Sequence, residues 1–316
     1  MPLIPFCKTA GLSREEWLKH RLNGIGGSDA ADVVGLSPYS SAYKVYLDKT
    51  GKLPEAEQTE SMRIGNDLED YVAKRFCEET GKKVKRTNFM YRHPEHEFML
   101  ADFDRLIVGE SAGLECKTTS AFAKSDFENG SVPNHYYVQC QHYMAVSGFD
   151  HWYLAVLVLG VGFYWFCIQR NEADIQALIE AEKAFWYTNI VPKEPPAPDG
   201  SDSTTDALNS SYAYDSGTEI ALYDQEETVA SILALKAEEA ERKKLIQQGE
   251  NLIKAQMEDA ATAYIPGYKA AWKTSTRKTF DTKKFRQDYP ELYEEYLREQ
   301  TTRKFTLQPV KENNNE

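Results

Sequence analysis

The sequence lacks any run of about eighteen or more apolar residues, the length that a helix needs to cross a membrane. Its most apolar stretch, WYLAVLVLGVGFYWFCI, is interrupted by Gly160 and Gly162 and predicts two buried strands joined by a tight turn. The first residues also lack the basic start and the long apolar centre of a signal peptide. We therefore expect a cytoplasmic protein that makes no contact with a membrane.

Cysteine pairs and an excess of basic residues are missing too. The five cysteines are far apart and form no CxxC pair, which argues against a zinc site or an iron–sulfur cluster and predicts reduced, packed thiols. The formal net charge of −12 excludes a surface that is basic all over. If the protein handles nucleic acid, the contact must be a local channel or must be bridged by cations.

Helical and strand-like patterns alternate between residues 13 and 190, which predicts a mixed α/β sheet flanked by helices. For the helix within 24–36 the expected N-cap is Ser28 or Asp29, and for the helix within 65–81 it is Asn66 or Asp67. The expected helices lie within 13–22, 24–36, 65–81, 134–148 and 173–190, and the expected strands within 96–108, 112–119 and the apolar hairpin.

After residue 192 the composition changes abruptly to Pro, Ser, Asp and Thr, which is typical of a linker. We therefore expect a core over 1–192, a linker or exposed loop over 193–222, and a mainly helical extension over 223–316. The extension begins with a long, highly charged helix whose apolar positions are too sparse for a coiled coil. Its tail mixes basic and aromatic residues, with ten Lys or Arg against six Asp or Glu between residues 263 and 305.

Charges of both signs occur in the predicted strand GLECKTT. Side chains two apart in a strand point the same way, so Glu115 and Lys117 share one face while Leu114 and Cys116 face the core. Asp104 lies in the preceding strand-like run, and we expect it to converge with them. Converging carboxylates repel unless a cation binds, and hard oxygen ligands, including the Cys116 carbonyl, suit Mg²⁺ or Mn²⁺. The alternative is an ordinary pair of charges on a solvated sheet.

Other polar residues extend this candidate site. Glu69 is on a predicted helix beside its apolar stripe and is either a further carboxylate or a plain surface acid. Arg21 and Ser28 frame the glycine-rich helix start RLNGIGGSDAA, where an arginine, a hydroxyl and free backbone N–H groups suit a phosphate. The alternative for Ser28 is a simple helix cap. Gln141, in the polar helix VQCQHYMA, either touches the site or satisfies buried backbone.

The ordered series Arg21, IGGSD, GNDLED, FDRLIVGESAGLECKT and QCQHYM resembles the YqaJ-like viral recombinase family. That family is related to the lambda exonuclease group of PD-(D/E)XK nucleases. The resemblance runs from about residue 12 to residue 190, and the tail GYKAAWKT…LYEEY is similar to the extension of longer YqaJ-type proteins. It implies a PD-(D/E)XK core within the α/β fold.

The resemblance implies a Mg²⁺-dependent exonuclease that degrades one strand of linear double-stranded DNA from the 5′ end. Its partners would be DNA ends and a RecT-type single-strand annealing protein, in the cytosol of a bacterium or a phage-infected host. It also implies a homo-oligomer, with the trimeric ring of the lambda type as one form. The long charged helix and the tail have no counterpart in the short lambda-type chain, so they are a candidate DNA-binding or partner-binding segment.

The resemblance also assigns roles to individual residues. Asp104 and Glu115 match the metal-binding acids, and Glu69 matches the acid of the upstream helix. Lys117 matches the catalytic lysine of the ExK element, and Arg21 and Ser28 match the pair that binds the 5′ phosphate. Gln141 matches the glutamine of the family's helix. FDR replaces the PDG turn of the lambda type, so Asp102 remains a rival to Asp104.

Two other functions remain open from the sequence. One is a DNA-binding recombination factor without catalysis, although the complete set of Asp104, Glu115 and Lys117 argues against it. The other is a structure-specific endonuclease on the same fold, although the phosphate cradle at Arg21 and Ser28 favours recognition of an end.

Overall fold

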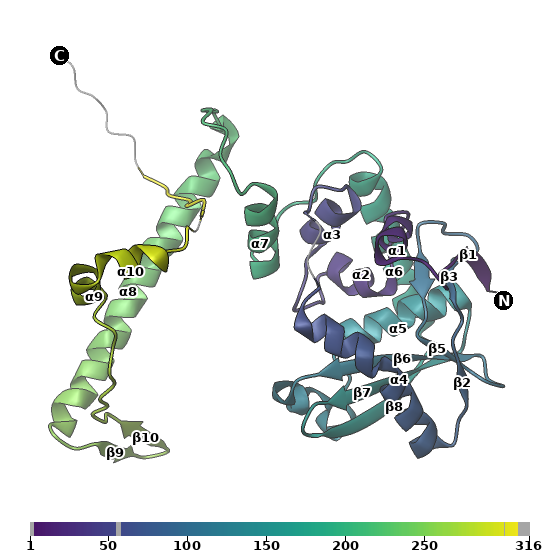
Figure 1. Cartoon of the computed structure of the whole chain (residues 1–316), viewed down its shortest axis with the longest axis horizontal. Coiled ribbons are helices and arrows are strands. Elements are labelled where there is room, and N and C mark those ends of the chain that lie inside the picture. The colour runs from purple at the N-terminus through teal and green to yellow at the C-terminus, as the bar shows by residue number, and fades with distance from the viewer. Residues whose placement is uncertain (1–2, 55–57, 300, 309–316) are drawn as a thin grey trace. The chain divides into compact units, whose positions relative to one another are not determined.

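The computed structural model of the chain describes residues 3–54, 58–299 and 301–308, and it divides into two units, Met1–Ala213 and Tyr214–Glu316. A five-stranded sheet forms the centre of the first unit (Figure 1). In sheet order its strands are β2 (Val84–Lys85), β5 (Arg105–Ile107), β6 (Ala112–Thr119), β7 (His151–Val158) and β8 (Gly162–Gln169). Only β6 and β7 run parallel, so the sheet is mixed, as expected.

A smaller antiparallel sheet lies beside it, with the order β1 (Ile4–Lys8), β3 (Phe89–Arg92) and β4 (Leu100–Asp102). The expectation of one strand over 96–108 is therefore wrong. The chain leaves the small sheet after Asp102 and enters the large one at Arg105, so the short turn between them lies where the two sheets meet.

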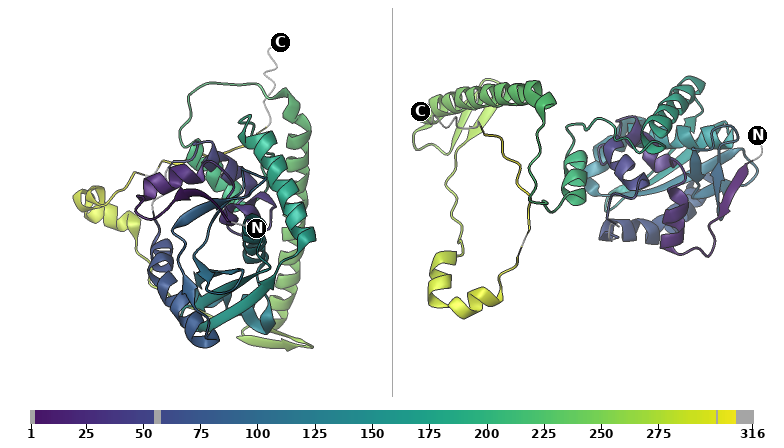
Figure 2. Two further views of the ribbon diagram at one scale, coloured as in Figure 1. Left: turned by 90° about the vertical axis from the view of Figure 1, so that its right-hand side faces the viewer. Right: turned by 90° about the horizontal axis from the view of Figure 1, so that it is seen from above.

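Helices cover both faces of the large sheet. On one face α4 (Glu60–Thr80) packs Val72 and Phe76 against Leu114 and Tyr153. On the other face α5 (Asn134–Ser147) packs its buried side chains against the opposite side of β7. Figure 2 shows the same layering from two further sides. The predicted α/β class, a mixed central sheet with flanking helices, is confirmed.

The remaining helices of this unit lie on the α5 side or at the edges. They are α1 (Arg14–Arg21), α2 (Gly27–Val33), α3 (Ala42–Lys49), the 3₁₀ turns of η1 (Ala121–Gly130), α6 (Glu172–Phe185), the π turn η2 (Trp186–Ile190) and α7 (Asp202–Ser211). Helix α2 packs so closely on α5 that a Cβ at Gly27 would lie 2.3 Å from the Tyr143 ring. Glycine at position 27 is thus required for this contact.

Two predicted helix starts need correction. The N-cap of α2 is Gly26, and Asp29 lies inside the helix, where its carboxylate accepts the Gly26 N–H. Helix α4 begins at Glu60 after the Thr59 cap, so Asn66 and Asp67 lie well within it. Each helix therefore begins before the predicted cap. In α4 the Thr59 hydroxyl accepts the Met62 N–H, so the first turn is already capped there.

Part of the stretch expected to be a linker packs on the first unit. Helix α7 buries Thr204 and Ala207, and the Thr204 hydroxyl donates to Ser41 Oγ at 2.8 Å. The Tyr46 hydroxyl also donates to the Lys193 carbonyl at 2.6 Å. A composition rich in Ser and Thr is typical of a linker, but these small side chains can also be buried against a helix.

The described part of the second unit contains a 3₁₀ turn, a long helix, a hairpin and two short helices. These are η3 (Tyr223–Gln225), α8 (Glu226–Met257), β9 (Thr262–Ile265), β10 (Tyr268–Ala271), α9 (Thr282–Asp288) and α10 (Pro290–Glu295). Met257 is the one buried residue of α8 among those described. No helix in the described part of the chain is long and apolar enough to span a membrane.

Candidate active site

Asp104 lies in the turn where the chain crosses from one sheet to the other. Phe103 before it and Arg105 after it are buried, which fixes the turn from both sides. The Asp104 carboxylate accepts the backbone N–H of Cys116 at 2.7 Å. This hydrogen bond attaches the turn to the middle of β6, so Asp104 and the β6 side chains converge as predicted.

Glu115 and Lys117 share one face of β6, and Leu114 points the other way into the α4 side of the core. The Lys117 ammonium lies 2.6 Å from Glu115 Oε1. Glu115 is only 3% exposed, so this is no solvated pair on a sheet surface. The predicted alternation is confirmed, and the pair does not lie on a solvated face of the sheet.

Burial gives these groups unusual proton affinities. Burial, with Glu115 and Glu69 nearby, raises the pKa of Asp104 well above its usual range. For Lys117 burial acts to lower the pKa, but Glu115 and Asp104 outweigh it and the pKa is raised. Lys117 is therefore held as a cation by the two carboxylates beside it.

Glu115 has one oxygen without a protein partner. Its Oε1 accepts from Lys117 and Gln139, whereas its Oε2 is buried with no hydrogen bond among the described residues. An orphaned carboxylate oxygen next to Asp104 fits a divalent cation, which would relieve both the repulsion and the unmet hydrogen bond. Within the described residues, however, no three His, Cys, Asp or Glu side chains form a cluster for a metal. The donor set that fits is two carboxylates with backbone oxygen.

Glu69 reaches this region from α4, but it is paired with Arg105. The Arg105 guanidinium donates to Glu69, to Asp70 and to the Asp104 carbonyl. Arg105 is buried, so the three contacts fix the start of β5 against α4. The structure thus puts Glu69 beside the site in an ion pair with Arg105, a partner that no local sequence pattern indicates.

Gln139, not Gln141, is the glutamine at the site. Gln139 Nε2 donates to Glu115 Oε1 at 2.7 Å and to the Tyr143 hydroxyl at 2.8 Å. Gln141 instead donates to the Gln169 carbonyl and accepts the Asn171 N–H, which joins α5 to the end of β8. The assignment of Gln141 is therefore corrected. Residues four apart share a helix face, so the pair Gln139 and Tyr143 was the available signal.

Replacing Gln139 with leucine should weaken the site without unfolding the protein. Gln139 fixes the orientation of Glu115, and such supporting contacts are typically worth about ten- to a hundredfold in metal affinity or activity. Isothermal titration with Mn²⁺ measures the loss. In the matched control, Gln141→Leu, metal affinity should be unchanged while the free energy of unfolding falls by about 1–3 kcal/mol. Equal metal affinity in both variants would contradict the assignment.

Arg21 and Ser28 meet at the start of α2, as predicted. Arg21 donates to Ser28 Oγ at 3.0 Å and to the Asp29 carboxylate at 2.6 Å. The other Asp29 oxygen pairs at 2.7 Å with Lys49, whose side chain is fully buried. Neither Asp29 nor Lys49 was predicted for the site, because their ion pair forms only when α2 packs on α3.

Asp102 is bound by a tryptophan. Trp17 Nε1 donates to the Asp102 carboxylate at 2.7 Å, and the Arg21 guanidinium lies 5.1 Å from the Trp17 ring centroid. Asp104 instead contacts β6, so the structure favours Asp104 over Asp102 beside Glu115.

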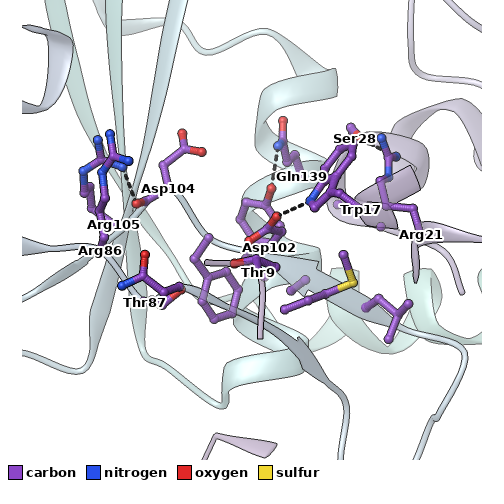
Figure 3. Close-up of a pocket in the computed structure, with 18 of the residues that line it drawn as sticks. Thr9, Trp17, Arg21, Ser28, Arg86, Thr87, Asp102, Asp104, Arg105 and Gln139 are labelled. Carbon is purple, nitrogen blue, oxygen red and sulfur yellow. Dashed lines mark hydrogen bonds between the residues drawn. The ribbon is translucent and has the colours of Figure 1, made fainter. Parts of the chain in front are cut away.

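One cavity of about 350 Å³ connects these groups (Figure 3). Asp104 and Arg105 lie on one side, Trp17, Arg21 and Ser28 on the other, and Gln139 between them. Glu115 does not line the cavity itself, but Gln139, which does, donates to Glu115 Oε1. Asp104 and the arginine–serine pair thus face one space large enough for part of a nucleotide chain.

Comparison with known proteins gives the family. Residues 16–150 match the model of the YqaJ-like viral recombinase domain. The chain is 39% identical over 308 residues to the uncharacterized protein YqaJ of Bacillus subtilis (strain 168), covering 96% of this chain and 97% of that protein. The chain therefore belongs to the YqaJ-like family, which confirms the resemblance seen in its sequence.

Similar solved structures include two exonucleases. The alkaline exonuclease LHK-Exo of Laribacter hongkongensis, in complex with dAMP, is 22% identical with a TM-score of 0.48, over 55% of this chain and 91% of that chain. A phage-related exonuclease from Haemophilus somnus 129PT is 13% identical with a TM-score of 0.40, over 54% of this chain and 96% of that chain.

Proposed function

We propose that the protein is a Mg²⁺-dependent exonuclease that degrades one strand of linear double-stranded DNA from 5′ to 3′. The observation that carries the proposal is the trio of Asp104, Glu115 and Lys117, in which Glu115 is buried and one of its oxygens has no described partner. Membership of a viral recombinase family supports DNA as the substrate.

Each residue then has a chemical role. Asp104, Glu115 and the Cys116 carbonyl would hold Mg²⁺, or Mn²⁺ in its place, and Glu69 would help from its place beside Arg105. The ion, when bound, supplies charge that polarises the scissile phosphate and lowers the pKa of a water. Lys117 is close enough to Glu115 to orient that water or to stabilise charge on a phosphoryl oxygen.

The cradle at the start of α2 would bind the 5′ phosphate. Arg21 provides a charged donor and Ser28 a hydroxyl, and both line the same cavity as Asp104. Binding an end phosphate there would place the next phosphate toward Asp104 and give the enzyme its direction. Phosphate contacts carry no base information, so cleavage should be largely independent of sequence.

The proposal extends to partners. The 3′ overhangs would pass to a RecT-type annealing protein in the cytoplasm, and the enzyme would act as a homo-oligomer, of which a trimeric ring is one form. The association state follows directly from light scattering of the purified protein.

The test is digestion of linear duplex beside a closed circle, with Mg²⁺, for the wild type and for Lys117→Ala. We expect loss of the linear DNA alone, faster with a 5′ phosphate than with a 5′ hydroxyl. The substitution should slow it by about a hundred- to a thousandfold, because a charged donor to the reacting phosphate is lost. Nicking of the circle would indicate an endonuclease, and binding without cleavage under any divalent metal would indicate a DNA-binding factor.

A further inference from the structure

A strongly basic segment occurs in the second unit of this acidic chain. Residues 268–286, here called the basic segment, contain seven Lys or Arg and a single acid, Asp281. The Asp281 carboxylate accepts the backbone N–H of Lys284, so it caps α9. The positive charge of the segment is therefore not balanced from within.

The long helix of the same unit shows the opposite pattern. In α8 four of the five basic residues pair with acids one turn away, as in Lys243 with Glu239 and Lys254 with Glu250. Among the described residues, no Lys or Arg of the basic segment has an acidic side chain within ion-pair distance. The helix is self-neutralised, whereas the basic segment presents cations that only an external anion can neutralise.

Aromatic side chains are interleaved with these cations and are exposed. Tyr264 and Tyr268 in the hairpin, with Trp272 and Phe280 after it, are between 50% and 80% exposed. Lys269 lies 5.6 Å from the Tyr264 ring centroid, so a cation and a ring already share one surface. Open aromatic faces beside unpaired cations are not a packed core and mark a binding surface.

We propose that the basic segment, with Tyr264 of the preceding strand, binds single-stranded DNA. Its cations suit a phosphate backbone and its open rings suit unpaired bases, which is the combination that single-strand binding uses. A duplex would use the cations alone, since its bases are stacked on one another and cannot reach the rings. None of its residues lines the cavity of the first unit, and under the proposed function its ligand would be the strand left by digestion.

The test is binding of a fluorescein-labelled oligothymidine to the full-length protein, followed by fluorescence anisotropy over a range of salt. EDTA is present, so binding is measured without cleavage and does not depend on the proposed nuclease activity. Two variants separate the two kinds of contact: Lys273→Ser with Lys278→Ser and Lys284→Ser, and Trp272→Leu with Phe280→Leu. The matched control is Lys236→Ser with Lys243→Ser and Lys244→Ser on α8, which changes the net charge equally.

The triple change in the basic segment should reduce the slope of log K against log salt by about two, at roughly 0.7 for each single-strand phosphate. The aromatic change should weaken binding about tenfold or more with the slope kept, because stacking is not ionic. The α8 control should bind as the wild type does. All of these positions are exposed, so circular dichroism should be the same throughout.

Three results would overturn the proposal: absence of oligothymidine binding by the wild type, binding of the matched duplex equal to that of the single strand, or equal losses in the basic-segment and α8 variants. If the wild type binds oligothymidine tightly but cleaves no DNA, the nuclease proposal is wrong and the proposal for the basic segment stands. If the wild type cleaves DNA and both basic-segment variants bind oligothymidine as the wild type does, the proposal for the basic segment is wrong and the nuclease proposal stands.

Discussion

Replacing Glu115 with glutamine should remove DNA cleavage almost completely, by about a thousandfold or more. The substitution keeps the shape of the side chain but removes the charge that attracts a cation and that pairs with Lys117. It also puts an amide where the buried Oε2 has no described partner. Single-turnover digestion of a linear duplex measures the rate, and Mn²⁺ titration by calorimetry measures the loss of the metal.

The control for Glu115→Gln is Glu110→Gln, which removes an acid whose side chain is 32% exposed and paired with Lys82. That variant should cleave and bind Mn²⁺ as the wild type does. If Glu115→Gln bound Mn²⁺ normally and still failed to cleave, the charge would act on Lys117 rather than on a metal. If it cleaved normally, Glu115 would be a structural acid and the proposed site would be wrong.

The strand that carries the site was predictable because its pattern is local. Alternation in GLECKTT is a property of successive residues, so Glu115 and Lys117 could be assigned to one face without knowledge of the fold. The apolar stripe of α4, with Val72 and Phe76, was predictable for the same reason. Local periodicity determines which side a residue faces.

The missed features depend on contacts between distant elements. The break at Asp104 arises because β4 and β5 pair with different strands, and no pattern within 96–108 records this. Gln139 and Gln141 are alike in sequence, and only the packing of α5 on the sheet decides which one meets Glu115. Likewise, the hydrogen bond from Arg105 to Glu69 depends on the packing of β5 near α4, which the local sequence does not show.

At the start of α2, the proposed phosphate-binding residue Arg21 is held in place by a buried pair of charges, Asp29 and Lys49. Lys49 is fully buried and would be costly alone, but Asp29 neutralises it and in turn holds Arg21. Asp29 is held ionised: burial acts to raise its pKa, but Arg21 and Lys49 outweigh this and lower it well below the usual range. Arg21, the proposed hydrogen-bond donor to the 5′ phosphate, is thus positioned by Asp29.

Replacing Asp29 with asparagine should therefore destabilise the first unit by about 3–5 kcal/mol at pH 7, because Lys49 is left buried without its partner. A depressed pKa makes this contribution complete above the unfolded value, roughly 3.9, and it is lost as the pH falls through the lower folded value. The gap between wild type and variant should therefore close in strong acid. Urea unfolding followed by tryptophan fluorescence reports on this unit, which holds Trp17, Trp152 and two further tryptophans.

Asp32, three residues further along the same helix, gives the matched control because its shift has the opposite sign. Burial raises the pKa of Asp32 to about 6. A raised pKa means that its contribution is present at low pH and lost as the pH rises through about 6, so at pH 7 the ionised group is unfavourable. Asp32→Asn should then leave stability at pH 7 unchanged or increased. Equal destabilisation by both changes would show that helix α2, rather than the Asp29 ion pairs, sets the result.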